Sequence, residues 1–155
     1  MEINEKLNLV LNDLIRLNHD REEGYANAIK QLGLNNNGLK KMFRNYEKDS
    51  SQFAETLSMY VARNGGKPST EATVSGKIYR AWMDIKAAMT NKESESILES
   101  CEYVEEATQK VYHHALRADV SMPADIRCVI MRQKFLLEKA HDAIKFKRNS
   151  QVVQH

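Results

Sequence analysis

Glutamates and one histidine recur near the middle of the long periodic segments of this sequence. In the last segment, Glu138 and His141 are three residues apart, a spacing at which a helix brings two side chains onto neighbouring positions. Carboxylate oxygens and imidazole nitrogens bind iron or manganese, and a two-metal centre in a helical bundle takes a Glu from each of two helices and a Glu-x-x-His pair from each of the other two. The candidate ligands are Glu22, Glu47, Glu105, Glu138 and His141.

This set of ligands is incomplete. The second segment offers Glu47 followed by Ser50, and a serine hydroxyl is a poor replacement for imidazole as a ligand. Glu138 lies about 120° from the centre of the apolar stripe of its own segment, which turns it away from an interior site. A hydrogen-bonded polar layer without a metal is therefore the favoured interpretation, and an iron- or manganese-binding oxidase or storage protein is the alternative.

The same mid-segment positions carry other polar residues. Four helices of about 26 residues each span about 39 Å, so side by side their midpoints share one layer. Arg21 projects from the buried stripe, where an arginine paired with a carboxylate or reaching the bundle edge is favoured over a ligand-binding one. Gly24 costs about 1 kcal/mol against alanine, which indicates close approach of a neighbouring helix or a large aromatic ring. The expected polar core layer contains Asn18, Arg21, Ser50 and Thr108.

Other catalytic arrangements are absent from the sequence. It contains no glycine-rich phosphate loop, no Cys-x-x-Cys pair and no nucleophile elbow. His113 and His114 are adjacent, so on a helix they point about 100° apart and do not share a metal. No catalytic residue is assigned, and a non-catalytic protein is favoured over an enzyme.

The elements that must position these residues are four long amphipathic segments and one shorter one. Apolar residues recur at spacings of three and four, which predicts helices. Short turns join the first long segment to the second and the third to the fourth, so each pair is antiparallel, whereas the shorter segment can return the chain and make the second and third long helices parallel. The expected helices are 4–32, 39–64, 69–91 (the shorter one), 91–120 with a capping box from Thr90 to Glu93, and 126–148.

These features predict an all-α protein, a ferritin-like four-helix bundle with a long crossover that carries a short extra helix. Residues 1–149 are expected to form a single domain, and residues 150–155 a frayed C-terminal tail.

Composition limits the partners. Among 155 residues, 23 Lys and Arg against 21 Asp and Glu give a formal charge of +2, too small a field to favour nucleic acid. No stretch of about 18 apolar residues is present, so no membrane span is expected. Two cysteines form no disulfide framework and suit a reducing compartment. A cytoplasmic location is expected.

The last long segment has a second apolar line on its outer side, formed by Cys128, Met131, Phe135 and Phe146. Exposed apolar lines often mark interfaces. Either the crossover helix or a second copy of the chain could cover this line, and the sequence leaves both alternatives open. A homo-oligomer with Met131, Phe135 and Phe146 at its interface is one expectation.

Four stretches together resemble a bacterial ferritin-like four-helix-bundle family that is known as a domain of unknown function. Gly24-Tyr25 and Trp82-Met83 are their most specific parts. The resemblance implies a ferritin-like fold and a bacterial source, and it brings no established activity. The stretches are LNDLIRLNHDREEGYANAI (11–29), RAWMDIK (80–86), ILESCEYVEEATQKVYHHAL (97–116) and EKAHDAIKFKR (138–148).

Overall fold

The computed structural model describes residues 2–32, 37–72, 76–90 and 94–153, and these residues form five α-helices and no strand. The expected all-α class is therefore confirmed. The helices are α1 (Glu2–Leu32), α2 (Asn37–Arg63), α3 (Gly76–Thr90), α4 (Ser94–Arg117) and α5 (Ala124–Val153).

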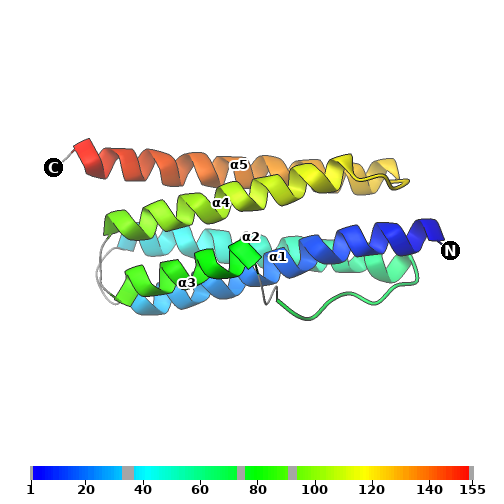
Figure 1. Ribbon diagram of the computed structural model, residues 1–155, viewed down its shortest axis with the longest axis horizontal. Coiled ribbons are helices and arrows are strands. Elements are labelled where there is room, and N and C mark those ends of the chain that lie inside the picture. Colours follow the sequence, from blue (N-terminus) through cyan, green and yellow to red (C-terminus); the bar gives the residue numbers. More distant parts are fainter. Residues whose placement is uncertain (1, 33–36, 73–75, 91–93, 154–155) are drawn as a thin grey trace.

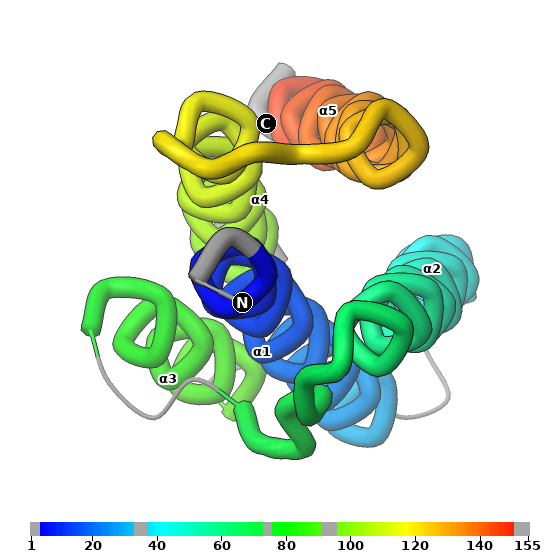
Figure 2. Tube along the Cα trace, turned by 90° about the vertical axis from the view of Figure 1, so that its right-hand side faces the viewer, coloured from blue at the N-terminus to red at the C-terminus, as the bar shows by residue number. Residues whose placement is uncertain are grey.

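The four long helices lie along the long axis of the molecule and form two antiparallel hairpins, α1 with α2 and α4 with α5 (Figure 1). The chain returns toward its starting end between the hairpins, so α2 and α4 run in the same direction, as the sequence predicted. Viewed along the bundle, α1, α2, α5 and α4 follow one another around a common centre, and α3 lies outside this ring against α1 and α4 (Figure 2).

The segment that follows α2 is hydrogen-bonded to α1. Helix α2 ends in a Schellman turn, in which Gly65 has a left-handed φ of 79° and the Gly66 amide donates to the Val61 carbonyl at 2.9 Å. The Ser69 amide then donates to Asn12 Oδ1 of α1 at 2.8 Å. Residues 69–72 are not helical, so the described helix α3 begins at 76 instead of near 69 as the sequence predicted.

Two apolar clusters fill the bundle, one on each side of the middle. The cluster toward the end of α1 is built around Tyr25, Phe43, Trp82, Ile97 and Ile144. The cluster toward the start of α1 is built around Leu11, Phe53, Leu57, Tyr112 and Ile130. Each long helix passes from one cluster to the other at its centre, and buried polar side chains occupy the level between them.

The expectation that the crossover helix covers the outer line of the last helix is wrong. Helix α3 packs against α1 and α4 and makes no contact with the described part of α5. Its Trp82 finds a complementary surface at Gly24 of α1, which α5 does not offer. Met131 and Phe135 are each 54% exposed and Phe146 is 74% exposed, so the second alternative, a partner copy, stays a prediction.

The helix ends differ from the predicted ones by a few residues. Helix α5 continues to Val153, past the predicted end near 148, and Ser150 Oγ donates to the Phe146 carbonyl within this extension at 2.9 Å. The predicted capping box from Thr90 to Glu93 extends into residues 91–93, which lie outside the described part of the chain. None of the described helices combines the length and the hydropathy that a membrane crossing needs.

Candidate functional site

The centre of the buried polar level is an ion pair between Arg21 of α1 and Glu105 of α4. Arg21 Nε lies 3.1 Å from Glu105 Oε1 and 3.0 Å from Oε2, and Nη2 lies 2.6 Å from Oε1. The two side chains are 1% and 0% exposed. The planar guanidinium therefore neutralises the carboxylate completely within the protein, and this pair joins the two hairpins through α1 and α4.

The Nη1 group of Arg21 is also hydrogen-bonded. Nη1 donates to Ser50 Oγ at 2.8 Å and to the Tyr46 carbonyl at 3.2 Å, both on α2. The guanidinium carbon lies 5.3 Å from the ring centre of Tyr25 and 5.1 Å from that of Tyr46, and the Tyr25 hydroxyl donates to Glu105 Oε1 at 3.1 Å. The charge is thus enclosed by aromatic faces and fixed hydrogen-bond acceptors.

The pKa values follow from this enclosure. Burial is the largest single influence and lowers the pKa of Arg21, but the attractions to Glu105, Tyr25 and Asp49 together outweigh it and leave the pKa above its usual value. Burial, reinforced by the Glu105 charge, raises the pKa of the Tyr25 hydroxyl well above 10.0. Burial likewise raises the pKa of the Cys101 thiol, one turn before Glu105. These groups keep one protonation state over the physiological range and offer no general acid or base.

A second buried network lies one turn away and touches all four long helices. Asn18 Nδ2 donates to the Tyr112 hydroxyl at 2.8 Å, and that hydroxyl donates to Gln133 Oε1 at 2.7 Å. Gln133 Nε2 reaches the Phe53 carbonyl of α2 at 3.4 Å. Tyr112 and Gln133 are buried on the core faces of α4 and α5, and the polar layer expected from the sequence included neither. Their polar ends within an otherwise apolar stripe were the available signal.

The residues proposed from sequence for the polar layer lie at this level. Asn18, Arg21, Ser50 and Thr108 are all buried, and Thr108 Oγ1 donates to the Val104 carbonyl within α4 at 2.8 Å. Three of these four bond across helices, whereas Thr108 bonds only within its own helix.

The residues proposed from sequence as metal ligands lie in separate places. Glu105 is inside the bundle with Arg21. Glu22 and Glu47 line a shallow hollow between α1 and α2. Glu138 pairs with Lys134 one turn earlier on the same helix. His141 faces α4, so the structure does not gather these five residues around one point.

A different group of metal-ligating side chains does converge, on the seam between α4 and α5. It consists of Glu102, Glu106 and His141, whose ligand atoms all lie within 4.8 Å of one another. Both glutamates lie off the core stripe and were missed. The signal was available, because they and His141 stand at comparable distances along the chain from the turn at 121–123, which places them opposite one another in an antiparallel hairpin.

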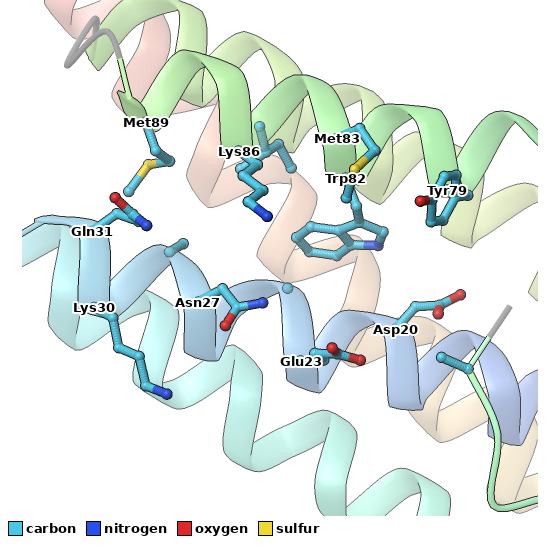
Figure 3. Close-up of a pocket in the computed structure, with 14 residues that line it drawn as sticks. Asp20, Glu23, Asn27, Lys30, Gln31, Tyr79, Trp82, Met83, Lys86 and Met89 are labelled. Atoms are coloured by element: carbon cyan, nitrogen blue, oxygen red, sulfur yellow. The ribbon is translucent and has the colours of Figure 1, made fainter. Parts of the chain in front are cut away.

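A groove of about 440 Å³ runs between α1 and α3. Trp82 lies across α1 in Figure 3, where an added Cβ at Gly24 would be 2.3 Å from its ring. This contact bears out the close aromatic approach predicted for Gly24. The charged residues along the groove have both signs, so its chemistry selects neither an anion nor a cation. They are Asp20, Glu23, Lys30 and Lys86.

The fold and its centre define an all-helical bundle whose interior holds a buried ion pair and a buried hydrogen-bond network. The chain belongs to the family described as Domain of unknown function (DUF2383), which matches residues 7–118. The match spans α1 to α4 and stops before α5, whereas the resemblance noted in the sequence extended to Arg148. No curated protein matches the chain. The ferritin-like relationship and the bacterial source stay predictions.

Proposed function

We propose that this protein is a non-catalytic ferritin-like bundle, in which an internal ion pair stands where related bundles hold metal. Two observations support the ferritin-like relationship: two antiparallel hairpins, and one crossover that makes α2 and α4 parallel (Figure 1). The observation that carries the non-catalytic role is the bidentate contact of Arg21 with Glu105.

The ion pair opposes an interior metal for electrostatic reasons. A di-metal centre needs several carboxylates whose charge is free to bind cations. Here the buried carboxylate of Glu105 already accepts from Arg21 and Tyr25. A divalent ion entering this level would be repelled by a guanidinium that the surrounding helices hold in place, at a low effective dielectric. The layer then fixes the register of the helices, and any binding by the protein takes place on its outer surfaces.

Iron and oxygen chemistry in a His141→Ala variant tests this role. That substitution removes the histidine from both the sequence-derived ligand set and the α4–α5 seam, so metal bound through His141 does not obscure binding in the interior. We expect both the wild-type chain and the variant, purified without chelator and then given Fe(II), to consume no oxygen, and the variant to hold no iron or manganese. About two metal ions per chain together with oxygen consumption would overturn the proposal.

A second candidate role is self-association through the outer line of α5. Its supporting observation is the exposure of Met131, Phe135 and Phe146 along one helix. Light scattering over a hundredfold range of concentration tests it. We expect a mass that rises with concentration and a return to monomer in a Phe135→Ser, Phe146→Ser variant. A monomer at every concentration excludes self-association.

A further inference from the structure

We propose that the seam between α4 and α5 binds one divalent transition-metal ion through Glu102, Glu106 and His141. The site is separate from the interior ion pair and does not depend on the proposed function, because an interior closed by Arg21 is compatible with a metal on the seam. The class of ligand is a borderline ion such as Zn²⁺, since one imidazole nitrogen with two carboxylates favours such ions over Mg²⁺ or Ca²⁺.

The backbone of the hairpin brings the three side chains together. Glu102 and Glu106 are four residues apart on α4 and therefore share one face, and His141 projects from α5 toward them. His141 Nε2 lies 3.3 Å from Glu106 Oε1. Bonds of about 2.0–2.2 Å in a tetrahedral site place ligand atoms about 3.4 Å apart. This pair already has that spacing, and a side-chain adjustment of Glu102 completes the set.

The surroundings of the imidazole ring give an independent reason to expect a cation. Both ring nitrogens face carboxylate oxygens, Nε2 that of Glu106 and Nδ1 that of Asp142 at 3.2 Å. The carboxylates of Glu102, Glu106 and Asp142 thus surround one ring, and their combined negative charge favours a bound cation. With a metal ion at Nε2, the Nδ1–H donates to Asp142. A carboxylate on the second nitrogen is the partner that metal-binding histidines commonly have.

Glu102 is positioned from its other side. It is 8% exposed, and its Oε2 lies 2.5 Å from Nε of Arg148, one of the last residues of α5. The ion pair fixes the carboxylate and leaves its second oxygen for the metal. Glu106 is exposed, so the site opens to solvent on that side and a water molecule can complete the coordination.

The test is Zn²⁺ titration of the tag-free chain by calorimetry. We expect one Zn²⁺ per chain, with affinity at least tenfold weaker in the His141→Ala and Glu106→Gln variants. The matched control is His114→Ala, which removes an exposed imidazole from α4 and leaves the affinity unchanged. Asp142→Asn is expected to keep one site and to weaken it about tenfold, as loss of such a supporting carboxylate does elsewhere.

Co²⁺ provides a second readout, because its visible absorption reports nitrogen and oxygen ligands directly. We expect Co²⁺ bands in the wild-type chain and the His114→Ala variant, none in His141→Ala, and displacement by Zn²⁺ but not by millimolar Mg²⁺. Circular dichroism establishes that each variant is folded. Equal Zn²⁺ affinity in the wild-type chain and His141→Ala, or no Zn²⁺ binding at about 100 µM, would overturn the proposal.

Discussion

Helix α4 carries three glutamates within two turns, and the molecule surrounds them in two different ways. Glu105 points into the bundle and meets a guanidinium held by α1. Glu102 and Glu106 point toward α5 and meet His141 at the seam. The interior carboxylate is 0% exposed and has its cation built into the chain, whereas the seam combines one buried carboxylate, one exposed carboxylate and a half-buried ring.

The difference shows how one residue type can serve structure in one place and binding in another. A fully buried carboxylate needs a permanent counter-charge, because the helices cannot pack while a charge is left without a partner. A carboxylate at the surface has water as an alternative, so its site can exchange a cation with solvent. Substitutions in the interior should therefore change folding stability strongly, and substitutions on the seam should change metal affinity while the fold persists.

The largest effect is expected from breaking the interior pair. Arg21→Met or Glu105→Leu alone leaves a buried charge without its partner and should lower the free energy of unfolding by about 3–5 kcal/mol. The double variant replaces both charges with apolar groups and should lose much less than the sum of the two single losses. Urea unfolding measures all three. Single losses below 1 kcal/mol would mean that the pair does not hold the hairpins together.

Alkaline pH should also lower the free energy of unfolding. Burial raises the pKa values of Tyr25, Tyr46 and Tyr112 above 10.0 in the folded protein, whereas the unfolded chain has ordinary tyrosines. The unfolded chain therefore loses protons first. The contribution of the tyrosines is complete below about pH 10 and falls above it, by about 1.4 kcal/mol at pH 11 for each tyrosine that stays protonated. The buried Cys101 thiol adds a loss in the same direction that begins at about pH 9. Urea midpoints at pH 9 and pH 11 test this, and equal midpoints would contradict it.

The next largest effect is expected at the contact between Gly24 of α1 and Trp82 of α3. A methyl group at Gly24 would lie 2.3 Å from the Trp82 ring, which is too large to move aside without displacing α3. Gly24→Ala should therefore cost about 1–3 kcal/mol despite the better helix propensity of alanine. The control is Gly38→Ala in α2, where the nearest atom would be 3.7 Å away, and this variant should be neutral or slightly stabilising. Thermal melting compares the two.

A smaller loss should follow from removing the hydroxyl that links the second network. Tyr112→Phe keeps the ring but takes away the acceptor for Asn18 and the donor for Gln133, which are both buried. The expected cost is about 1 kcal/mol. Tyr103→Phe on the exposed side of α4 is the matched control and should change stability by less than about 0.5 kcal/mol. If the two variants melt alike, the network contributes nothing measurable.

The sequence allowed the helices and their directions to be predicted, because apolar periodicity and short turns are local signals. It also predicted the close approach of a neighbouring helix or a large aromatic at Gly24, since a mid-helix glycine is otherwise costly. It did not identify Glu105 as the partner of Arg21, because that pairing depends on the height of α4 relative to α1. Glu102 and Glu106 were not predicted as ligands for a related reason. They can act as ligands because α5 places His141 opposite them, whereas the residue spacing within a single helix indicated Glu138.

The smallest expected effect distinguishes the Glu-x-x-His pair within α5 from the ligand group that α4 and α5 form together. Glu138 pairs with Lys134 four residues earlier, and its side chain is 47% exposed. An exposed pair of this kind contributes less than about 0.5 kcal/mol, so Glu138→Gln should unfold within that margin of the wild-type chain. Its Zn²⁺ affinity should also be unchanged, whereas Glu106→Gln loses affinity. A weakened Zn²⁺ site in Glu138→Gln would restore the Glu-x-x-His pair as a ligand set and move the metal away from the α4 glutamates.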